Sequence, residues 1–363
     1  MVLAIIIQNL FSLIKNMYLK IAVAQLFMLM ASVQILTAQV KTNNSILLSN
    51  YTFLESERVI GQISVQQPNT SIKKVSISGA DAAFFKSNKK HQLIIKSNKS
   101  KKFYNIQLLV TNDQNIQLQQ NFTIVKDEFL KNKVIAHRGA WKNLPTAENS
   151  IAALQQAIKL GCQGSEFDVH ISADSVAFIN HDPAFKKVEI EQTSSLVLKE
   201  LTLSNNEKLP LLDDYLKAGK NQNHTKLILE IKPTKLGLDR VKLIAKSVLE
   251  SVSENEAQAW VEYISFDYEI CKALMAIDPF AKVAYLNGDK SPEQLAADKF
   301  YGLDYHYSVF KKNPDWIKNA LALGLTVNAW TANDTETIQW LLDSKATFIT
   351  TNEPELALKM VSK

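Results

Sequence analysis

The sequence predicts an α/β fold, a TIM (β/α)8 barrel, in its C-terminal two thirds and a small all-β domain before it. At 363 residues the chain is longer than one typical domain. Short apolar runs typical of strands alternate with helical stretches in the C-terminal part, which indicates repeated βα units. Roughly 230 residues of this repeat fit eight units, since such barrels usually take about 250 residues.

Residues 1–39 are predicted to be a secretory signal peptide. Lys15 and Lys20 precede the apolar run Ile21–Leu36, and small residues follow it. Met17 is an alternative start, because the residues before it add a second apolar run that a signal does not need. We therefore expect an exported protein, periplasmic or secreted. Alternatively the run stays uncleaved as an anchor, because it is nearly long enough to span a bilayer.

Residues 40–128 are predicted to form a β-sandwich. Runs such as Val59–Val65 and Phe103–Val110 alternate apolar and polar residues, and turns rich in Asn, Ser and Lys separate them. Ser76–Phe85, followed by Tyr104–Asp113, resembles a cadherin-like repeat. Most acidic calcium signatures of such repeats are missing, so we expect no calcium in this domain. Its expected role is that of a spacer, a docking surface or a packing partner of the barrel.

Residues 129–363 are predicted to form the barrel. Nine runs have strand character, so one of them is expected to be an extra hairpin strand or a short terminal strand. The segment Asp182–Pro210 is long for a connection and is predicted to be an insertion over the site. The expected strands are Val134–His137, Ser165–Val169, Val176–His181, Leu227–Lys232, Val261–Phe266, Val283–Leu286, Gly302–His306, Leu325–Trp330 and Thr347–Thr350. The expected helices are Asn149–Leu160, Asp239–Glu250, Asp267–Ile277, Pro292–Lys299, Pro314–Leu323 and Asp334–Leu342.

Charge and cysteine content exclude two classes of protein. The formal net charge is +5. Without residues 1–39, whose only charged residues are Lys15 and Lys20, it is 39 − 36 = +3. This near-neutral balance gives no case for nucleic-acid binding. Two cysteines, Cys162 and Cys271, exclude a disulfide scaffold, and both are interpreted as buried free thiols.

Chemically active side chains recur at the ends of the expected strands, as the active sites of barrels do. Glu166 and Asp168 are two residues apart on one strand, so both point to one face, where unpaired carboxylates repel each other. A hard cation would relieve this repulsion, and Glu230 can supply a third oxygen. All-oxygen ligation favours Mg²⁺ or Ca²⁺. The alternative is a buried ion-pair network with Lys232 or Arg138.

His137 and His181 each close an expected strand. One imidazole can deprotonate an attacking hydroxyl or water while the other protonates the leaving alkoxide, and the sequence does not say which does which. Arg138 and Lys232 suit contacts with a phosphate, with charge compensation of the acids as their alternative role.

Three further residues are candidates for supporting roles. Asn149 is expected either to cap a helix or to support the site, and Glu148 to orient His137, Arg138 or a metal-bound water. Trp330 is expected to wall the mouth or contact a substrate alcohol, with ordinary packing as the alternative.

These clusters, in this order, resemble the glycerophosphodiester phosphodiesterase family from about residue 134 to 354. The matching segments are Ala136–Gly139, Glu148–Ser150, Glu166–Val169, Ile179–Asp182, Leu209–Leu212, Leu229–Lys232, Ala329–Asn333 and Ile349–Pro354. The resemblance implies metal-dependent hydrolysis of a small glycerophosphodiester to an alcohol and glycerol 3-phosphate. It also implies that His137 and His181 are the acid–base pair. The implied metal ligands are Glu166, Asp168 and Glu230, and the implied phosphate contacts are Arg138 and Lys232.

Three positions depart from the family pattern: Ala147 stands for Pro, Ser175 for Gly and Asn352 for Asp. None is expected to touch the metal ligands. Two other functions stay open, a phospholipase-type release of a cyclic phosphate and a non-catalytic surface module that binds phosphate-bearing lipid or glycan. An exposed apolar rim around the mouth would favour the phospholipase reaction and a place at a membrane surface. The sequence gives neither the headgroup nor the oligomeric state.

Overall fold

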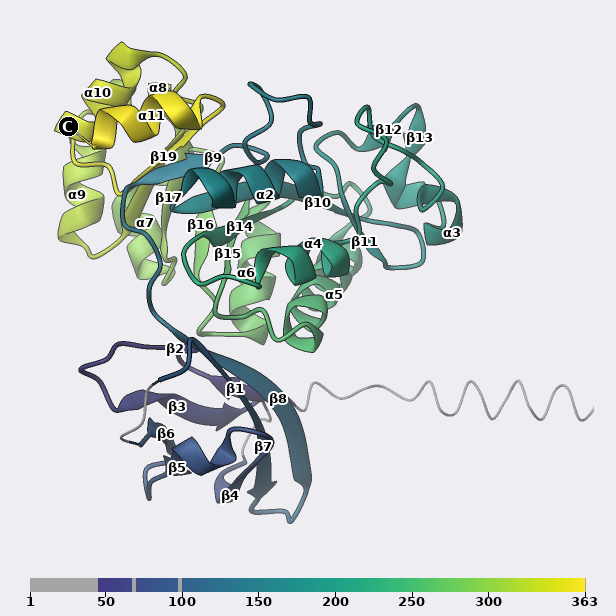
Figure 1. Ribbon diagram of the computed structural model, residues 1–363, viewed down its shortest axis with the longest axis vertical. Helices are drawn as coiled ribbons and strands as arrows, with labels where there is room; N and C mark the ends of the chain where they lie inside the picture. The colour runs from purple at the N-terminus through teal and green to yellow at the C-terminus, as the bar shows by residue number, and fades with distance from the viewer. Residues whose placement is uncertain (1–44, 67–69, 97–99, 363) are drawn as a thin grey trace, which may run out of the picture. The chain divides into compact units, whose positions relative to one another are not determined.

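The computed structural model describes residues 45–66, 70–96 and 100–362 (Figure 1). The predicted signal peptide, residues 1–39, lies outside the described residues, as does the alternative start at Met17. Within the described ranges, no helix is both long enough and apolar enough to cross a membrane.

The residues before the barrel form two four-stranded sheets. Their elements are β1 (Ile46–Leu48), β2 (Thr52–Phe53), β3 (Val59–Val65), β4 (Ile72–Ser78), the 3₁₀ turn η1 (Ala82–Phe84), β5 (Phe85–Ser87), β6 (Gln92–Ile95), β7 (Phe103–Asn112) and β8 (Gln117–Lys126). One sheet has the order β1-β3-β6-β5 and the other β2-β8-β7-β4. Alternate residues of β7, including Tyr104, Ile106 and Leu108, are buried with Leu93 of the other sheet in one core. The period-two pattern in the sequence is therefore the pattern of burial.

Eight parallel strands close into a barrel, which confirms the predicted fold class. In order around the barrel they are β9 (Val134–Ala136), β10 (Gly164–Ile171), β14 (Lys226–Ile231), β15 (Val261–Ser265), β16 (Val283–Tyr285), β17 (Gly302–His306), β18 (Thr326–Trp330) and β19 (Phe348–Thr351). Because β9 pairs with both β10 and β19, the sheet has no free edge there. The extra strand is β11 (Ala177–Ile179), which forms an antiparallel hairpin with β10.

Helices surround the barrel strands (Figure 1). They are α2 (Ile151–Leu160), α4 (Leu212–Gly219), α5 (Leu238–Glu254), α6 (Tyr268–Ile277), α7 (Pro292–Ala297), α8 (Tyr307–Lys312), α9 (Trp316–Ala322), α10 (Thr335–Asp343) and α11 (Pro354–Val361). The helices that the sequence predicted are all present. Helices α4, α8 and α11 were not predicted.

Strand β14 shows how alternation builds the barrel. Leu229 and Ile231 face outward and pack in the large core between strands and helices. Ile228 faces inward, where it packs with Ile264 in a small apolar core inside the barrel. Glu230 shares this inward face, two residues nearer the carboxyl end. The same strand therefore fills the barrel floor and delivers an acid to its mouth.

The predicted insertion between β11 and α4 is a small folded unit. It contains β12 (Ala184–Phe185), β13 (Val188–Glu189), the 3₁₀ turn η2 (Ile190–Gln192) and α3 (Ser195–Leu198). Ile190, Leu198 and Leu209 are buried in its own core.

Asp304 on β17 is a buried acid that makes stability depend on pH. Its Oδ2 accepts a hydrogen bond from Asn328 at 2.9 Å, whereas its Oδ1 has no partner in the described part of the chain. Burial raises the pKa of Asp304 to about 7. An unfolded Asp has a pKa of about 3.9, so the folded state alone holds this proton between roughly pH 4 and 7. The contribution of this proton to the free energy of unfolding is fully present below about pH 4 and is lost as the pH rises through 7.

We expect Asp304→Asn to raise the free energy of unfolding at pH 8 by on the order of 3 kcal/mol, and by less at pH 5. The amide keeps an oxygen for Asn328 and carries no charge at either pH. Thermal unfolding followed by circular dichroism at both values measures the effect. Asp315→Asn, at an exposed acid before α9, is the matched control. Equal gains at pH 5 and pH 8 would contradict this account of Asp304.

Candidate active site

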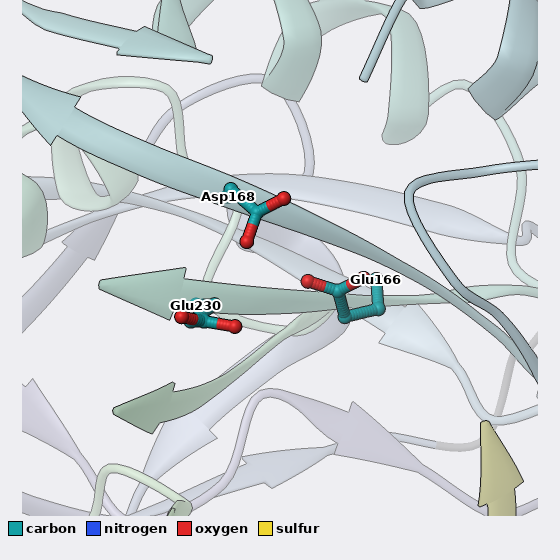
Figure 2. A group of neighbouring side chains, drawn as sticks. All are labelled: Glu166, Asp168 and Glu230. Carbon is teal, nitrogen blue, oxygen red and sulfur yellow. The ribbon is translucent and has the colours of Figure 1, made fainter. Parts of the chain in front are cut away.

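Three buried carboxylates converge near the carboxyl ends of β10 and β14. Oxygens of Glu166, Asp168 and Glu230 all lie within 4.8 Å of one another. Figure 2 shows the two β10 side chains on the same side of their strand as Glu230 of the neighbouring strand. Glu166 and Asp168 share a face because they are two residues apart, and the parallel register places Asp168 opposite Glu230. The structure thus brings together the three acids that the sequence singled out.

The surroundings shift the pKa values of the three acids in different directions. Burial, together with the charges of Asp168 and Glu230, raises the pKa of Glu166 well above its usual value. Burial and Asp168 also raise the pKa of Glu230 to about 7. Burial acts in the same direction on Asp168, but the Lys232 ammonium and hydrogen bonds hold its pKa below the usual value. Because the three carboxylates are buried side by side, a positive charge next to them would stabilise their ionised forms.

Lys232 supplies part of this positive charge. Its Nζ lies 2.6 Å from Glu230 Oε1 and 2.8 Å from Asp168 Oδ1. The ion-pair alternative raised by the sequence is thus present for two of the acids. Glu166 Oε1, in contrast, is a buried oxygen with no hydrogen-bond partner among the described residues. One ammonium for three carboxylates leaves room for a hard cation with oxygen ligands, so the residues fit Mg²⁺ or Ca²⁺.

A tight turn after β9 presents the Arg138 main chain to the acids. Arg138 has φ of 57° and Gly139 φ of 79°, both in the left-handed region. A Cβ on Gly139 would lie 2.7 Å from Ala153, so only glycine fits here. This backbone lets the Arg138 amide donate to Glu166 Oε2 at 2.9 Å. The left-handed Arg138 is strained, and such strain clusters at functional sites.

The Arg138 side chain is fixed by hydrogen bonds, but one of its N–H groups has no partner among the described residues. Its Nη1 donates to both carboxylate oxygens of Glu148, at 3.0 and 3.1 Å. Glu148 therefore orients Arg138, one of the three roles foreseen for it. Arg138 Nε lies 3.5 Å from Asp168 Oδ2 and has no hydrogen-bond partner in the described ranges. A buried guanidinium N–H without a partner is suited to an anionic ligand.

Of the two roles expected for Asn149, helix capping and support of the site, the structure shows no capping and places its side chain against a site acid. Ser150 caps α2, because its side chain accepts from the Ala153 amide. Asn149, with φ of 60°, turns inward instead. Its Nδ2 donates to Asp168 Oδ2 at 2.8 Å, and its Oδ1 accepts from the Asp168 amide at 3.1 Å. The buried Asp168 carboxylate needs hydrogen-bond partners. Because Ser150 caps the helix, the Asn149 side chain is available to hold Asp168 in place.

His137 is half-buried beside the acids, and one of its ring nitrogens lies against an amide oxygen. Its Nδ1 lies 2.8 Å from Asn352 Oδ1 and its Nε2 lies 3.9 Å from Glu166 Oε2. Since the amide oxygen accepts, Nδ1 carries the proton and Nε2 presents a lone pair. Burial first, and then the charge of Arg138, lowers the pKa of His137 to about 4.

Asn352 is a functional contact that the sequence reasoning missed. It was recognised only as a departure from the family pattern that touches no metal ligand. The structure gives it another role, as the partner of His137. The signal that could have found it is its place directly after β19, at the same end of the barrel as the other site residues.

His181 reaches the mouth by a different route from the one predicted. It follows β11, which runs antiparallel to the barrel strands, so its strand end points opposite to theirs. It still arrives near the acids because β10 is long and the hairpin returns along it, with the Asn180 amide bonded to the Asp168 carbonyl. Its Nδ1 lies 2.8 Å from Asp182 Oδ1. The His170 ring, given no role from the sequence, contacts the His181 carbonyl at 3.2 Å.

Trp330 belongs to an aromatic group at the ends of three strands. Its ring makes edge-to-face contacts with Phe266 at 5.6 Å and His306 at 5.2 Å between centroids. Its Nε1 donates to the Asp304 carbonyl at 2.9 Å. These contacts satisfy the packing role, and the half-buried rings also form a wall at the carboxyl ends of β15, β17 and β18.

Comparisons with known proteins identify the family of the barrel. A model of the glycerophosphoryl diester phosphodiesterase family matches residues 137–356. A glycerophosphodiester phosphodiesterase from Caldanaerobacter subterraneus is 24% identical over 250 residues, which cover 64% of this chain and 99% of that protein. A crystal structure of a glycerophosphodiester phosphodiesterase from Parabacteroides distasonis has a TM-score of 0.62 and 40% identity, covering 63% of this chain and 96% of that one.

A phosphodiesterase from Oleispira antarctica, solved in complex with the product sn-glycerol-3-phosphate, is also similar. Its TM-score is 0.57 and its identity 24%, over 64% of this chain and 97% of that one. At this identity the likeness shows the fold. The family match leaves the two four-stranded sheets outside it, so their likeness to a cadherin-like repeat stays a prediction.

Proposed function

Because this chain belongs to the glycerophosphoryl diester phosphodiesterase family and is a phosphodiesterase, we propose that it hydrolyses glycerophosphodiesters to an alcohol and glycerol 3-phosphate with the help of a divalent cation. The observation that carries the proposal is the group of three buried carboxylates beside a neutral imidazole. The product named for the Oleispira protein agrees in chemistry with this reaction.

Glu166, Asp168 and Glu230 would hold the cation, Mg²⁺ or Ca²⁺. The unpartnered Glu166 oxygen and the raised pKa values of Glu166 and Glu230 support this. When bound, the cation supplies positive charge that polarises the phosphoryl oxygens of the diester. Its uptake would release the protons that the acids hold without it.

His137 is assigned as the general base because of its hydrogen bond. With Nδ1–H donated to Asn352, the free Nε2 lone pair can accept the proton of the glycerol hydroxyl next to the phosphate. That hydroxyl oxygen forms a new bond to phosphorus, and the bond from phosphorus to the alcohol oxygen breaks. The products of this step are a cyclic phosphate and the alcohol. Attack within one molecule gains from proximity.

His181 is assigned as the general acid that protonates the departing alcohol oxygen. Its Nδ1 faces the Asp182 carboxylate, an anionic partner suited to a ring that carries two protons. In the second step water opens the cyclic phosphate: the water oxygen bonds to phosphorus and its proton goes to His181. The bond from phosphorus to the glycerol oxygen that attacked in the first step breaks, and that oxygen takes the proton that His137 holds, which gives glycerol 3-phosphate. Lys232 and Arg138 would hold the phosphate oxygens. Arg138 Nε has no hydrogen-bond partner among the described residues and lies 3.5 Å from Asp168, one of the three acids.

We expect turnover of glycerophosphocholine, glycerophosphoethanolamine and glycerophosphoinositol to be lost in EDTA and restored by Mg²⁺ or Ca²⁺. The reason is that the carboxylates repel one another and the phosphate unless a cation neutralises them. Release of glycerol 3-phosphate from each diester, measured before chelation, after chelation and after each cation is added back, is the test. Equal rates in EDTA and in either cation would overturn the metal-dependent mechanism.

A further inference from the structure

His170 is a third histidine at the mouth of the barrel. It lies two residues after Asp168 on β10, so its side chain emerges on the same face as that carboxylate. The parallel register that sets Asp168 against Glu230 brings His170 alongside Lys232 on the next strand. The residue is half-buried. The two other histidines of the site carry the acid–base roles of the proposed function, so this ring has no assigned part in the chemistry.

The His170 ring contacts the main chain of the residue proposed as general acid. Its Nε2 lies 3.2 Å from the carbonyl oxygen of His181. A carbonyl oxygen can only accept a hydrogen bond, so Nε2 carries a proton and donates the bond. This contact therefore ties the backbone of His181 to a side chain that is anchored on a barrel strand.

The His181 main chain has little other support. Strand β11 ends at Ile179, and the Asn180 amide makes the last main-chain bond of the hairpin. Among the described residues, His181 makes no backbone–backbone hydrogen bond, and the next one along the chain is accepted by the Pro183 carbonyl. The His170 ring therefore holds the chain in the gap between the hairpin and the insertion.

The His181 side chain is also weakly restrained. It is 38% exposed, so packing fixes its position only in part. Its Nδ1 lies 2.8 Å from Asp182 Oδ1, but that carboxylate is 74% exposed, and exposed pairs of this kind contribute little. A shift of the His181 main chain would carry the ring with it. Because proton transfer requires the donor within hydrogen-bond reach of the acceptor oxygen, a small displacement lowers the rate.

We propose that His170 is a positioning residue, whose hydrogen bond to the His181 carbonyl places the His181 ring where it can protonate the departing alcohol oxygen. In that step the bond from phosphorus to the alcohol oxygen breaks and the His181 proton moves to this oxygen, while no proton moves to or from His170. The proposal rests on the proposed function for the role of His181. Loss of the His170 bond should therefore slow only a cleavage that needs this proton.

Two diesters with different leaving groups test this role. Choline leaves glycerophosphocholine as a strongly basic alkoxide unless it is protonated, whereas p-nitrophenolate leaves the p-nitrophenyl diester of glycerol 3-phosphate as a stable anion without help from an acid. In His170→Leu we expect choline release to slow about 10–100-fold and p-nitrophenol release to stay within about threefold of the wild type. The full chain, in excess over the diester and with Mg²⁺ or Ca²⁺ present, limits the measurement to the first step.

Two further variants separate the hydrogen bond from the space that the ring fills. His170→Gln keeps an N–H donor at about the reach of Nε2, so choline release should stay within about threefold of the wild type. His224→Leu removes another ring that contacts a main-chain carbonyl at 3.2 Å, ahead of β14 at the amino end of the barrel, and should leave both rates unchanged. Equal losses for the two diesters, a Leu variant as fast as the wild type, or a Gln variant as slow as the Leu variant would overturn the positioning role.

A measurement without turnover keeps this role separate from the proposed function. The chain has six histidines, so NMR of the full chain with isotopically labelled histidine gives few ring signals, and His181→Asn identifies those of His181. We expect the His181 signals to shift or broaden in His170→Leu and to stay in place in His170→Gln. Unchanged His181 signals in the Leu variant would overturn the positioning role. A wild type that cleaves neither diester would count against the proposed function, and the ring signals would still decide the role of His170.

Discussion

Glu230→Gln is expected to remove nearly all cation-dependent hydrolysis and to leave the barrel folded. The amide has the size of the carboxylate but lacks its charge, so the site loses one of its three anionic oxygen donors. It also loses the 2.6 Å ion pair that positions Lys232. Because a bound cation contributes several kcal/mol to charge stabilisation, we expect a rate about 10²–10³-fold lower. Initial rates at increasing Mg²⁺ and Ca²⁺, with calorimetric titration of each cation, measure both effects.

Glu262→Gln is the matched control for this variant. Glu262 is also a buried acid of a barrel strand, and it too pairs with a lysine, Lys282, at 3.2 Å. It lies at the start of β15, at the amino end of the barrel. Any loss that comes from placing an amide in a charged barrel site should appear in both variants. If both lose activity alike, or if Glu230→Gln binds the cation as the wild type does, the assignment of Glu230 as a ligand fails.

The barrel could be predicted from the sequence because its strands are set by local patterns. A run such as Leu227–Leu229 is apolar on both faces because helices cover one and the barrel interior the other. The ninth strand was recognised as an extra one, but which it was could not be read, since β11 has the same composition as the barrel strands. Only pairing in space identifies it as the antiparallel partner of β10.

In the candidate site, too, some features follow from local sequence patterns and others do not. The spacing of Glu166 and Asp168 fixes their common face, and the location of strand ends brings Glu230 to the same mouth. Hydrogen bonds between residues that are far apart in the sequence cannot be predicted from local patterns. The sequence left capping and support of the site equally open for Asn149, and its hydrogen bonds with Asp168 decide between them. Asn352 lies 215 residues from His137, so no short-range pattern connects the two.

His137→Asn is expected to lower kcat for glycerophosphocholine by about 10²–10⁴-fold with a much smaller change in KM. The reason is that Nε2, the lone pair assigned to accept the proton, is removed, whereas Arg138 and Lys232 still hold the phosphate. His224→Asn should leave kcat unchanged, because this ring contacts the Glu128 carbonyl at 3.2 Å and none of the site residues named above. A kcat for His137→Asn close to that of the wild type would remove the imidazole from the mechanism.

Asn352→Ala separates positioning from folding. Without its amide oxygen, Nδ1 loses its acceptor and the ring can turn or change tautomer, so we expect kcat to fall by roughly 10–100-fold. If Asn352 acts only through His137, the double variant His137→Asn, Asn352→Ala should be no slower than His137→Asn alone, because the second change has no base left to misplace. Additive losses in the double variant would instead mean that Asn352 acts on the reaction independently of this histidine. Melting temperatures of all three proteins should agree, since the pair lies at the mouth, away from the apolar core inside the barrel.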